Sequence, residues 1–143
     1  MSERLQAIAL GVIVDESEVL LVEHVNPKIG QDGKSLDFAF PGGKVEPKEW
    51  PEDAAVREIL EESGLRTEAV AIIDERPHPN FPVFVSYIGC RLVAPRSELV
   101  PVTDPAIKCS LWVPGDRLEQ TFSTTINERV AWYVRDQIKR RAA

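Results

Sequence analysis

The sequence predicts a single α/β domain in which helices pack on a β-sheet. Short apolar segments rich in β-branched residues recur along the chain, an amphipathic helix pattern lies between them, and a second helix pattern ends the chain. The 143 residues, 43% of them apolar and 28% charged, suit one globular domain with its own core. We therefore expect residues 1–143 to fold as one domain.

The N-terminal part is expected to form three strands. Apolar runs at 5–14 and 18–23, with a polar turn between them, indicate a hairpin of well-buried strands, and a third strand follows at 36–40. Residues 25–35 contain Asn, Pro, Asp and two glycines, which are typical of a loop. A loop of this length either contacts a substrate or simply runs over the surface.

A helix is expected next, beginning near Pro51 and ending at Gly64. Proline suits the first helical position, acidic residues follow it in the first turn, and a glycine at the C-terminal end accepts a left-handed conformation. At about 100° per residue, the apolar side chains that share one face are Val56, Ile59 and Leu60. We expect this face to be buried against the sheet.

The other face of this helix carries three carboxylates, those of Glu58, Glu61 and Glu62. Like charges at these spacings destabilise a helix by roughly a few tenths of a kcal/mol per pair, so the cluster requires an explanation. One explanation is a solvated acidic surface. The other is a site for a divalent cation such as Mg²⁺, which prefers hard oxygen ligands.

The spacing around these carboxylates favours the second explanation. Residues 43–65 fit G-x5-E-x7-R-E-U-x-E-E-x-G-U, where U is a bulky apolar residue and where Glu49 and Arg57 occupy the first acidic and the basic position. This stretch resembles the Nudix box, the signature of Nudix hydrolases, with no position missing. The resemblance indicates a metal site rather than a solvated surface.

The rest of the chain is expected to supply the other elements of this family's fold. Strands are expected at 67–75, 83–93 and 107–113, with proline-marked loops at 76–82 and 94–105. The 83–93 strand is apolar on both faces, which is typical of a central, covered strand. A capping-box pattern, Thr125-x-x-Glu128, begins the last helix. This order of elements resembles the Nudix α/β/α sandwich around a mixed β-sheet.

The resemblance implies a Mg²⁺-dependent hydrolase of phosphorus-containing acid anhydrides, with Mn²⁺ able to substitute. Such an enzyme cleaves the diphosphate linkage of a nucleoside diphosphate linked to another moiety. A MutT-like pyrophosphohydrolase acting on a (deoxy)nucleoside triphosphate is the first expectation, and an ADP-ribose or nucleotide-sugar pyrophosphatase is the second. A third, from another class, is a Nudix module that binds a nucleotide without cleaving it.

The resemblance also assigns roles within the box. Glu61 and Glu62 would be the main side-chain metal ligands, and Glu58 would be a further ligand or the base that activates water. A backbone carbonyl of the glycine pair would join the metal shell, and the pair here is Gly42 and Gly43.

Two further box residues, Arg57 and Glu49, match positions that pair with each other and orient the glutamates. Outside the box the chain departs from the family, because it lacks the glutamate that relatives commonly carry shortly before the strand at Ile107. Asp104, or more distantly Glu98, is left as a substitute ligand. The alternative for Asp104 is an ordinary Asp-Pro turn.

Few residues mark the substrate. ADP-ribose hydrolases of the family often carry a proline some fifteen residues after the box, a position that Pro79 and Pro82 bracket. The aromatic residues that either stack on a base or belong to the core are Phe38, Phe40, Phe81 and Phe84. His24 and His78 are expected to be structural or exposed, although the proline-rich loop could place His78 at the substrate cleft.

Composition excludes several classes of function. The formal charge of −6 argues against binding to nucleic acid, and no apolar run is long enough to cross a membrane. No secretory signal pattern is found, and Cys90 and Cys109 are expected to be buried free thiols, so we expect a cytoplasmic protein. The expected partner is a small-molecule nucleotide; a homodimer is compatible with the family but no residue requires it.

Overall fold

The computed structural model of the chain describes residues 4–122 and 125–142. Residues 1–3, at the start of the segment expected to contain no secretory signal, lie outside the described part. The strands are β1 (Gln6–Asp15), β2 (Glu18–Ile29), β3 (Ser35–Ala39), β4 (Gly42–Lys44), β5 (Thr67–Pro77), β6 (Val83–Leu92) and β7 (Ile107–Pro114). The helices are α1 (Pro51–Ser63), the 3-10 helix η1 (Gly115–Arg117), α2 (Leu118–Thr121) and α3 (Glu128–Ala142). The predicted order of elements is confirmed, with β4, η1 and α2 as short additions.

The strands form a mixed sheet with two halves, which are joined beside the turn between β1 and β2 and diverge from there. In the first half, β1 runs parallel to β6 and antiparallel to β4, and β6 pairs with β5. In the second half, β2 pairs with β3 and β7. The expected hairpin of β1 and β2 is paired at Val14–Val19 and Asp15–Glu18 beside its turn. Beyond these pairs each strand has other partners, so the two halves diverge and leave space between them.

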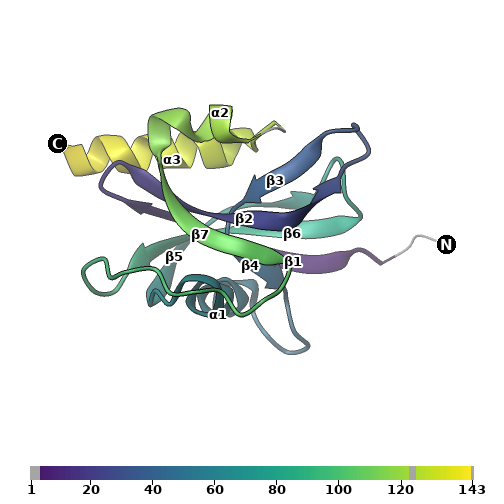
Figure 1. Ribbon diagram of the computed structural model, residues 1–143, viewed down its shortest axis with the longest axis horizontal. Coiled ribbons are helices and arrows are strands. Elements are labelled where there is room, and N and C mark those ends of the chain that lie inside the picture. Colours follow the sequence, from purple (N-terminus) through teal and green to yellow (C-terminus); the bar gives the residue numbers. More distant parts are fainter. Residues whose placement is uncertain (1–3, 123–124, 143) are drawn as a thin grey trace.

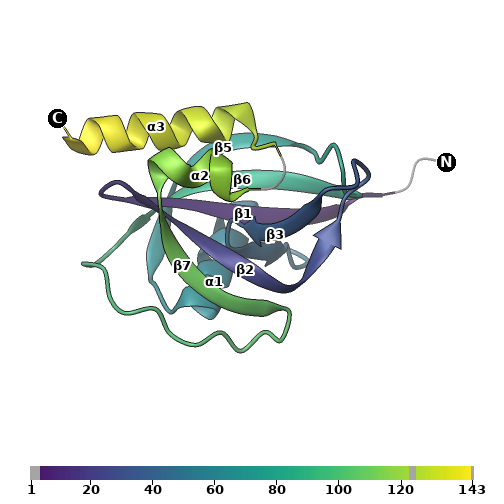
Figure 2. The ribbon, with the colours of Figure 1, turned by 45° about the horizontal axis from the view of Figure 1, so that its top comes forward.

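Helices cover both faces of the sheet, as the sequence predicts. Figure 1 shows α1 on one side of the strands and α3, with α2, on the other, and the turned view in Figure 2 keeps this arrangement. The strand β6 divides its buried side chains between the two layers. Val85 and Tyr87 belong to the apolar cluster that includes α3, whereas Ile88 and Cys90 belong to the cluster that includes α1. The central position predicted for this strand is confirmed.

The loop expected at 25–35 is shorter than predicted. β2 continues to Ile29 and β3 starts at Ser35, and the two pair as Lys28–Leu36 and Ile29–Ser35 after an irregularity in register. The connection is therefore 30–34. The side chains of β2 beyond His24 are exposed, so this part of the strand is held by backbone pairing and lacks the apolar pattern that would have marked it.

The proline-rich loop is also shorter than predicted, because β5 includes Arg76 and Pro77, which pair with Val85 and Phe84. Proline cannot donate to a neighbouring strand, but β5 is at the edge of the sheet, where no neighbour requires that donor. The remaining connection to β6 is 78–82.

The last helix starts differently from the prediction. α3 begins at Glu128, and the residue that caps it is Asn127 rather than Thr125. The Oδ1 atom of Asn127 accepts hydrogen bonds from the backbone N–H groups of Arg129 (2.8 Å) and Val130 (3.3 Å). Its Nδ2 atom donates to Asp74 on β5 at 3.0 Å. Asparagine is a strong N-cap, and here the tertiary contact to β5 favours it over the capping-box pattern.

Two further expectations concern the thiols and the membrane. Both cysteines are free, as predicted, but Cys109 is half-buried while Cys90 is buried, so the expectation of two buried thiols is wrong for Cys109. No helix in the ranges 4–122 and 125–142 is long and apolar enough to cross a membrane.

Candidate functional site

The helix α1 carries the carboxylates of the site, and its ends are as predicted. Pro51 occupies the first turn, and Gly64 caps the C-terminal end with φ 78°, donating its N–H to the Leu60 carbonyl at 2.8 Å. The buried face is not the predicted one, because Leu60 is 40% exposed. The residues of α1 that are buried are Ala54, Ala55, Ile59, Glu62 and Ser63.

The difference has a physical cause. Ala54 and Ala55 are small, and on the sheet Gly11 faces the same helix at Ile59, where a Cβ atom would lie 2.5 Å from Ile59 Cδ1. The helix therefore approaches β1 closely with its alanine side inward, which turns Leu60 outward and brings Glu62 into the interior. A glutamate that the sequence places on the polar face thus lies on the buried one.

The first contact within the box joins Arg57 to Glu49. The guanidinium donates from Nε to Glu49 Oε2 at 2.9 Å and from Nη2 to Oε1 at 3.0 Å, which is a bidentate pair. Nη2 also donates to the Lys44 carbonyl at 3.1 Å, so the pair ties α1 to β4 and to the loop before the helix. The hydrogen bonds from Arg57 hold the pKa of Glu49 below its usual value.

Arg57 also contacts two of the three clustered glutamates. Its Nη1 atom lies 3.0 Å from Glu58 Oε1 and 3.4 Å from Glu61 Oε1. Glu61 is exposed, whereas Glu58 is partly buried, and burial raises the pKa of Glu58 above its usual value. The predicted contacts of Arg57 and Glu49 are present, and through Nη1 they orient two carboxylates of the cluster.

Glu62 is the buried member of the cluster, with 3% of its surface exposed. Its Oε1 atom accepts the backbone N–H of Gly42 at 2.9 Å, and its Oε2 atom has no hydrogen-bond partner in the described part of the chain. Burial raises the pKa of Glu62 to about 8, against the opposing effect of the Gly42 hydrogen bond. A buried carboxylate oxygen without a partner is unfavourable unless something else satisfies it.

The glycine pair lies between β1 and α1 with no room for side chains. A Cβ atom at Gly42 would meet the Ala9 carbonyl at 2.1 Å, and one at Gly43 would meet Glu58 Oε1 at 2.6 Å. The pair belongs to β4, which is antiparallel to β1. The absence of a side chain at Gly42 lets its N–H reach Glu62 Oε1 at 2.9 Å, and the absence of one at Gly43 leaves room for the Glu58 carboxylate.

Asp104 lies near the same carboxylates. Its charge contributes to the raised pKa values of Glu58 and Glu62. At the same time Asp104 Oδ1 accepts the N–H of Ala106 at 2.9 Å, and its carbonyl accepts the N–H of Ile107 at 3.1 Å. Both interpretations of Asp104 therefore have support, since it forms the Asp-Pro turn and also adds negative charge beside the box.

The loop that carries Asp104 is held at two other points. Arg96 donates to Asp15 at 2.9 Å and to Glu18 at 2.7 Å, and its guanidinium carbon lies 3.9 Å from the centre of a Trp112 ring. Val100 donates its N–H to the Ser63 carbonyl at 3.2 Å, at the C-terminal end of α1. These contacts keep the loop across the end of the box helix.

The oxygen atoms of the box are of the kind that a hard divalent cation prefers as ligands. They are carboxylate and carbonyl oxygens, and one buried carboxylate oxygen lacks a partner. Within residues 4–122 and 125–142, no three His, Cys, Asp or Glu side chains are gathered closely enough to form a finished metal site. Glu58 and Glu61 each contact Arg57 instead.

A cavity of about 450 Å³ adjoins the box, in the space between the diverging halves of the sheet. Glu62, Gly42 and Gly43 lie on its wall, so the carboxylate cluster and the cavity are continuous. The aromatic residues that line it are Phe40, Phe81, Tyr87 and Phe122. Of the four phenylalanines proposed for stacking on a base, Phe40 and Phe81 are at the cavity. Phe40 also belongs to the apolar core, and Phe38 packs against that core.

For several residues that line the cavity, the sequence contains no pattern that predicts this position. His24 lines the cavity and is half-buried, and its Nδ1 atom lies 2.9 Å from the Leu36 carbonyl, which is compatible with the structural role expected for it. His78 also lines the cavity, which is the position that the proline-rich loop could give it, and Lys28 and Asn127 line it as well. No pattern marks them, because they come from three separate elements that meet only when the two halves of the sheet separate.

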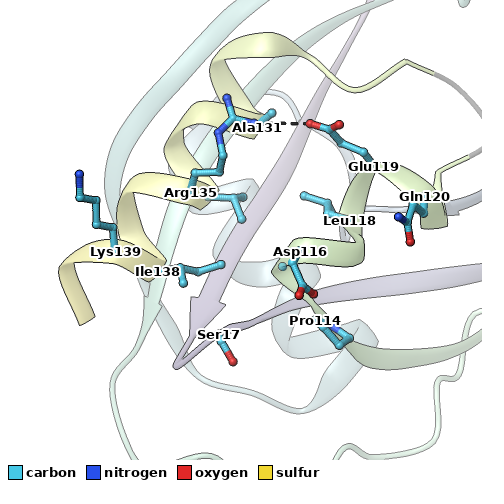
Figure 3. A pocket seen from close by; sticks show the side chains of 12 residues that line it. Ser17, Pro114, Asp116, Leu118, Glu119, Gln120, Ala131, Arg135, Ile138 and Lys139 are labelled. Carbon is cyan, nitrogen blue, oxygen red and sulfur yellow. Dashed lines mark hydrogen bonds and ion pairs between the residues drawn. The ribbon is translucent and has the colours of Figure 1, made fainter. Parts of the chain in front are cut away.

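A second cavity, of about 710 Å³, lies between η1, α2 and α3 and is shown in Figure 3. Its charged groups include Arg135 and Glu119, which pair with each other at 3.4 Å across the opening. None of the box residues lines it. We therefore do not assign it to the same site.

Comparison with known sequences adds an independent finding. Residues 4–133 match the family model described as NUDIX domain. The nucleoside diphosphate-linked moiety X motif 6 of Homo sapiens is 34% identical over 128 residues, which are 85% of this chain and 38% of that protein. The chain therefore spans little more than a third of the length of this human relative. The 8-oxo-dGTP diphosphatase of Proteus vulgaris is 34% identical over 82 residues, which are 57% of this chain and 70% of that protein.

Comparison with solved structures bears on the fold. An ADP-ribose pyrophosphatase from Streptococcus suis has a TM-score of 0.68 with 23% identity, covering 94% of this chain and 92% of that one. At this identity the similarity shows the fold, and it confirms the predicted α/β arrangement of helices around a mixed sheet.

Proposed function

Because this chain belongs to the NUDIX domain family, we propose that it is a metal-dependent hydrolase of the diphosphate linkage in a nucleoside diphosphate linked to another moiety. A (deoxy)nucleoside triphosphate is the first candidate substrate, supported by the similarity to an 8-oxo-dGTP diphosphatase. ADP-ribose is the second candidate substrate. It is supported by Pro82, which lines the cavity and which, with Pro79, brackets the sequence position at which ADP-ribose hydrolases of the family often carry a proline.

The observation that carries the proposal is the position of Glu62. It is a buried carboxylate with an unpartnered oxygen in the described part of the chain, and it lies on the wall of a cavity large enough for a small molecule. An ionised carboxylate in such a place is stabilised by a cation, and a diphosphate brought beside it requires one as well.

Three carboxylates and one backbone group would hold the cation. They are Glu58, Glu61, Glu62 and the carbonyl of Gly42. When bound, a divalent ion such as Mg²⁺, or Mn²⁺ in its place, neutralises the diphosphate oxygens and acidifies water. The protein contributes position and charge, which is most of what phosphoryl transfer requires.

Within this proposal Arg57 has a defined part. Its bidentate pair with Glu49 fixes the guanidinium, and the Nη1 atom then holds the side chains of Glu58 and Glu61 on one side of the helix. Glu58 is partly buried, which raises its pKa, and in this proposal it is either a further metal ligand or the base that accepts a proton from the attacking water.

The non-catalytic alternative, a module that binds a nucleotide without cleaving it, is less well supported. Such a module has no need of three clustered carboxylates, and each of them is retained beside the cavity or on the adjoining helix face. We also propose that the described residues form one domain, since β6 and β7 from the second half of the chain pair with β1 and β2 from the first.

The test is a panel of nucleotides incubated with the protein and Mg²⁺, with the products identified. A nucleoside triphosphate would yield the monophosphate and pyrophosphate, whereas ADP-ribose would yield AMP and ribose phosphate. Chelation of the metal should stop either reaction. Tight binding of a nucleotide with no product in Mg²⁺ or Mn²⁺ would overturn the enzyme proposal in favour of the binding module.

A further inference from the structure

The cavity beside the box is bordered by two hairpin connections that touch each other. The backbone N–H of Gln31, in the 30–34 connection, donates to the Asn80 carbonyl in the 78–82 connection at 3.1 Å. At Gly30 a Cβ atom would lie 3.0 Å from Asn80 Cβ and 3.4 Å from Phe81 Cζ, so the two connections are closely packed. This contact holds the 78–82 connection in place beside the cavity.

The position of the proton on His78 follows from that connection. The backbone N–H of Asn80 donates to His78 Nδ1 at 3.0 Å, so Nδ1 is an acceptor and carries no proton. The proton of the neutral ring is therefore on Nε2, which is a hydrogen-bond donor. Burial lowers the pKa of His78, which favours the neutral ring. The ring also packs edge-on against Phe81, with centroids 5.1 Å apart.

His24 has the opposite arrangement. Its Nδ1 atom lies 2.9 Å from the Leu36 carbonyl, and a carbonyl only accepts, so Nδ1 carries the proton. In the neutral ring Nε2 is then an acceptor. When both rings are neutral, Nε2 of His78 is a donor and Nε2 of His24 is an acceptor, and both residues line the cavity that also contains Glu62.

Three other polar residues of the cavity, Asn127, Lys28 and Lys44, are less suited to recognise a neutral ring, and Gln6, Tyr87 and Thr125 also line it. The Oδ1 atom of Asn127 is already used by two backbone N–H groups of α3, and one Nδ2 proton is used by Asp74. Lys28 and Lys44 are charged donors. The surrounding wall is rich in apolar and aromatic side chains, which suits a flat heterocycle.

We propose that His24 and His78 determine substrate preference by accepting from and donating to a heterocyclic base that presents a hydrogen-bond donor beside an acceptor. The inference rests on the proposed function, since it assigns the base of the nucleotide to this cavity and its diphosphate to the box. A base without a donor beside an acceptor would leave the Nε2 atoms of His24 and His78 buried and unpaired, which costs binding free energy. The two histidines therefore act by excluding such bases.

The test compares two replacements at each histidine. Asparagine places its amide near the position of Nδ1, so His78→Asn and His24→Asn keep the contacts to Asn80 or Leu36 and remove Nε2. Glutamine places its amide near the position of Nε2, so His78→Gln and His24→Gln are the matched controls. Thermal unfolding of each variant verifies that it is folded.

The substrates are inosine triphosphate, whose base has a donor beside an acceptor, and purine riboside triphosphate, which lacks that donor. We expect the wild type to prefer the inosine nucleotide in kcat/KM, and each asparagine variant to lose roughly three- to tenfold of this preference. The glutamine variants should retain more of it. Equal preference in the wild type and both asparagine variants would overturn the inference.

A binding measurement separates this inference from the proposed function. Calorimetric titration with the α,β-methylene analogues of the same two nucleotides, in Mg²⁺, reports preference without turnover. If the wild type hydrolyses neither nucleotide but the asparagine variants lose binding preference, the proposed function fails and the inference stands. If hydrolysis occurs and neither measurement changes in the variants, the inference fails and the proposed function stands.

Discussion

Glu62 accepts the backbone N–H of Gly42 at 2.9 Å with one carboxylate oxygen, while its other oxygen is buried without a partner among the described residues. This contact joins the box helix to β4. The position after Pro41 is a glycine for a separate reason, since a Cβ atom there would meet the Ala9 carbonyl at 2.1 Å. The buried oxygen is the feature from which the metal proposal follows.

Stability of the metal-free protein should fall as the pH rises from about 5 to 8. The pKa of Glu62 is about 8 in the folded state, against 4.5 as the reference value, so folding favours the protonated form. The contribution of Glu62 to the free energy of unfolding is therefore fully present below the pKa that Glu62 has in the unfolded chain. It is lost as the pH rises through the pKa that Glu62 has in the folded protein. The loss should be ~2–5 kcal/mol, measured by thermal or urea unfolding in chelator.

Glu62→Gln provides the comparison for this pH dependence, because glutamine keeps an acceptor for the Gly42 N–H and does not ionise. The variant should lose much less stability over the same range, and saturating Mg²⁺ should reverse the loss in the wild type. Glu49 and Asp74 have lowered pKa values, so their effects fall below this window. The lowered pKa of His78 opposes the loss and the raised pKa of Glu58 adds to it, but both groups are present in the wild type and in the variant, so the difference between the two curves reports Glu62. Parallel stability curves for the wild type and Glu62→Gln would contradict the buried ionisation.

Replacing Arg57 by lysine should weaken the metal site without unfolding the protein. Lysine keeps the charge but cannot form the bidentate pair with Glu49 while also contacting Glu58 and Glu61. We expect kcat/KM and the apparent Mg²⁺ affinity to fall by roughly 10–100-fold, as for other groups that orient metal ligands. The matched control is Arg91→Lys, because Arg91 pairs with Glu68 away from the box. Similar losses in both variants would show that the effect is not specific to the box.

Alanine at Gly43 should displace Glu58. The new Cβ atom would lie 2.6 Å from Glu58 Oε1, and the carboxylate end of a flexible side chain can move away. The expected result is a fall of roughly tenfold in Mg²⁺ affinity with little loss of stability. In a double-mutant cycle with Glu58→Ala the two effects should not add, because the clash disappears when the carboxylate is removed. Additive effects would place the cost of Gly43→Ala elsewhere.

Asp104→Asn tests whether this residue serves the metal. Asparagine retains an acceptor for the Ala106 N–H, so the turn should remain and only the charge is lost. If Asp104 acts beside the box, as its effect on the pKa values of Glu58 and Glu62 indicates, the apparent Mg²⁺ affinity should fall severalfold. An unchanged affinity together with unchanged unfolding would leave Asp104 as a turn residue.

Local signals in the sequence were enough to predict α1. Pro51, Gly64 and the box spacing lie within one short stretch, and the helix ends where they indicate. The buried face could not be predicted in the same way, because it depends on how closely Gly11 of β1 allows the helix to approach. That approach decides that Leu60 is exposed and Glu62 is buried.

The cavity could not be predicted from the sequence for a similar reason. It exists because β1 and β2 separate after two paired positions and take different partners. His24 and His78 come to it from strands and connections of the two halves, and Asn127 reaches it by capping α3. Only strand pairing between distant segments brings these residues together, and no local pattern records that pairing.

The most direct test of the metal-dependent hydrolase is turnover by Glu62→Gln at saturating Mg²⁺, with the best nucleotide of the panel and with thermal unfolding to show that the variant is folded. Loss of the ionised carboxylate should lower kcat by two orders of magnitude or more, roughly the scale of losing one charged group from a preorganised site. Glu119→Gln, far from the box at the second cavity, should retain wild-type turnover. A folded Glu62→Gln with wild-type kcat at saturating Mg²⁺ would remove Glu62 from the site and contradict the account.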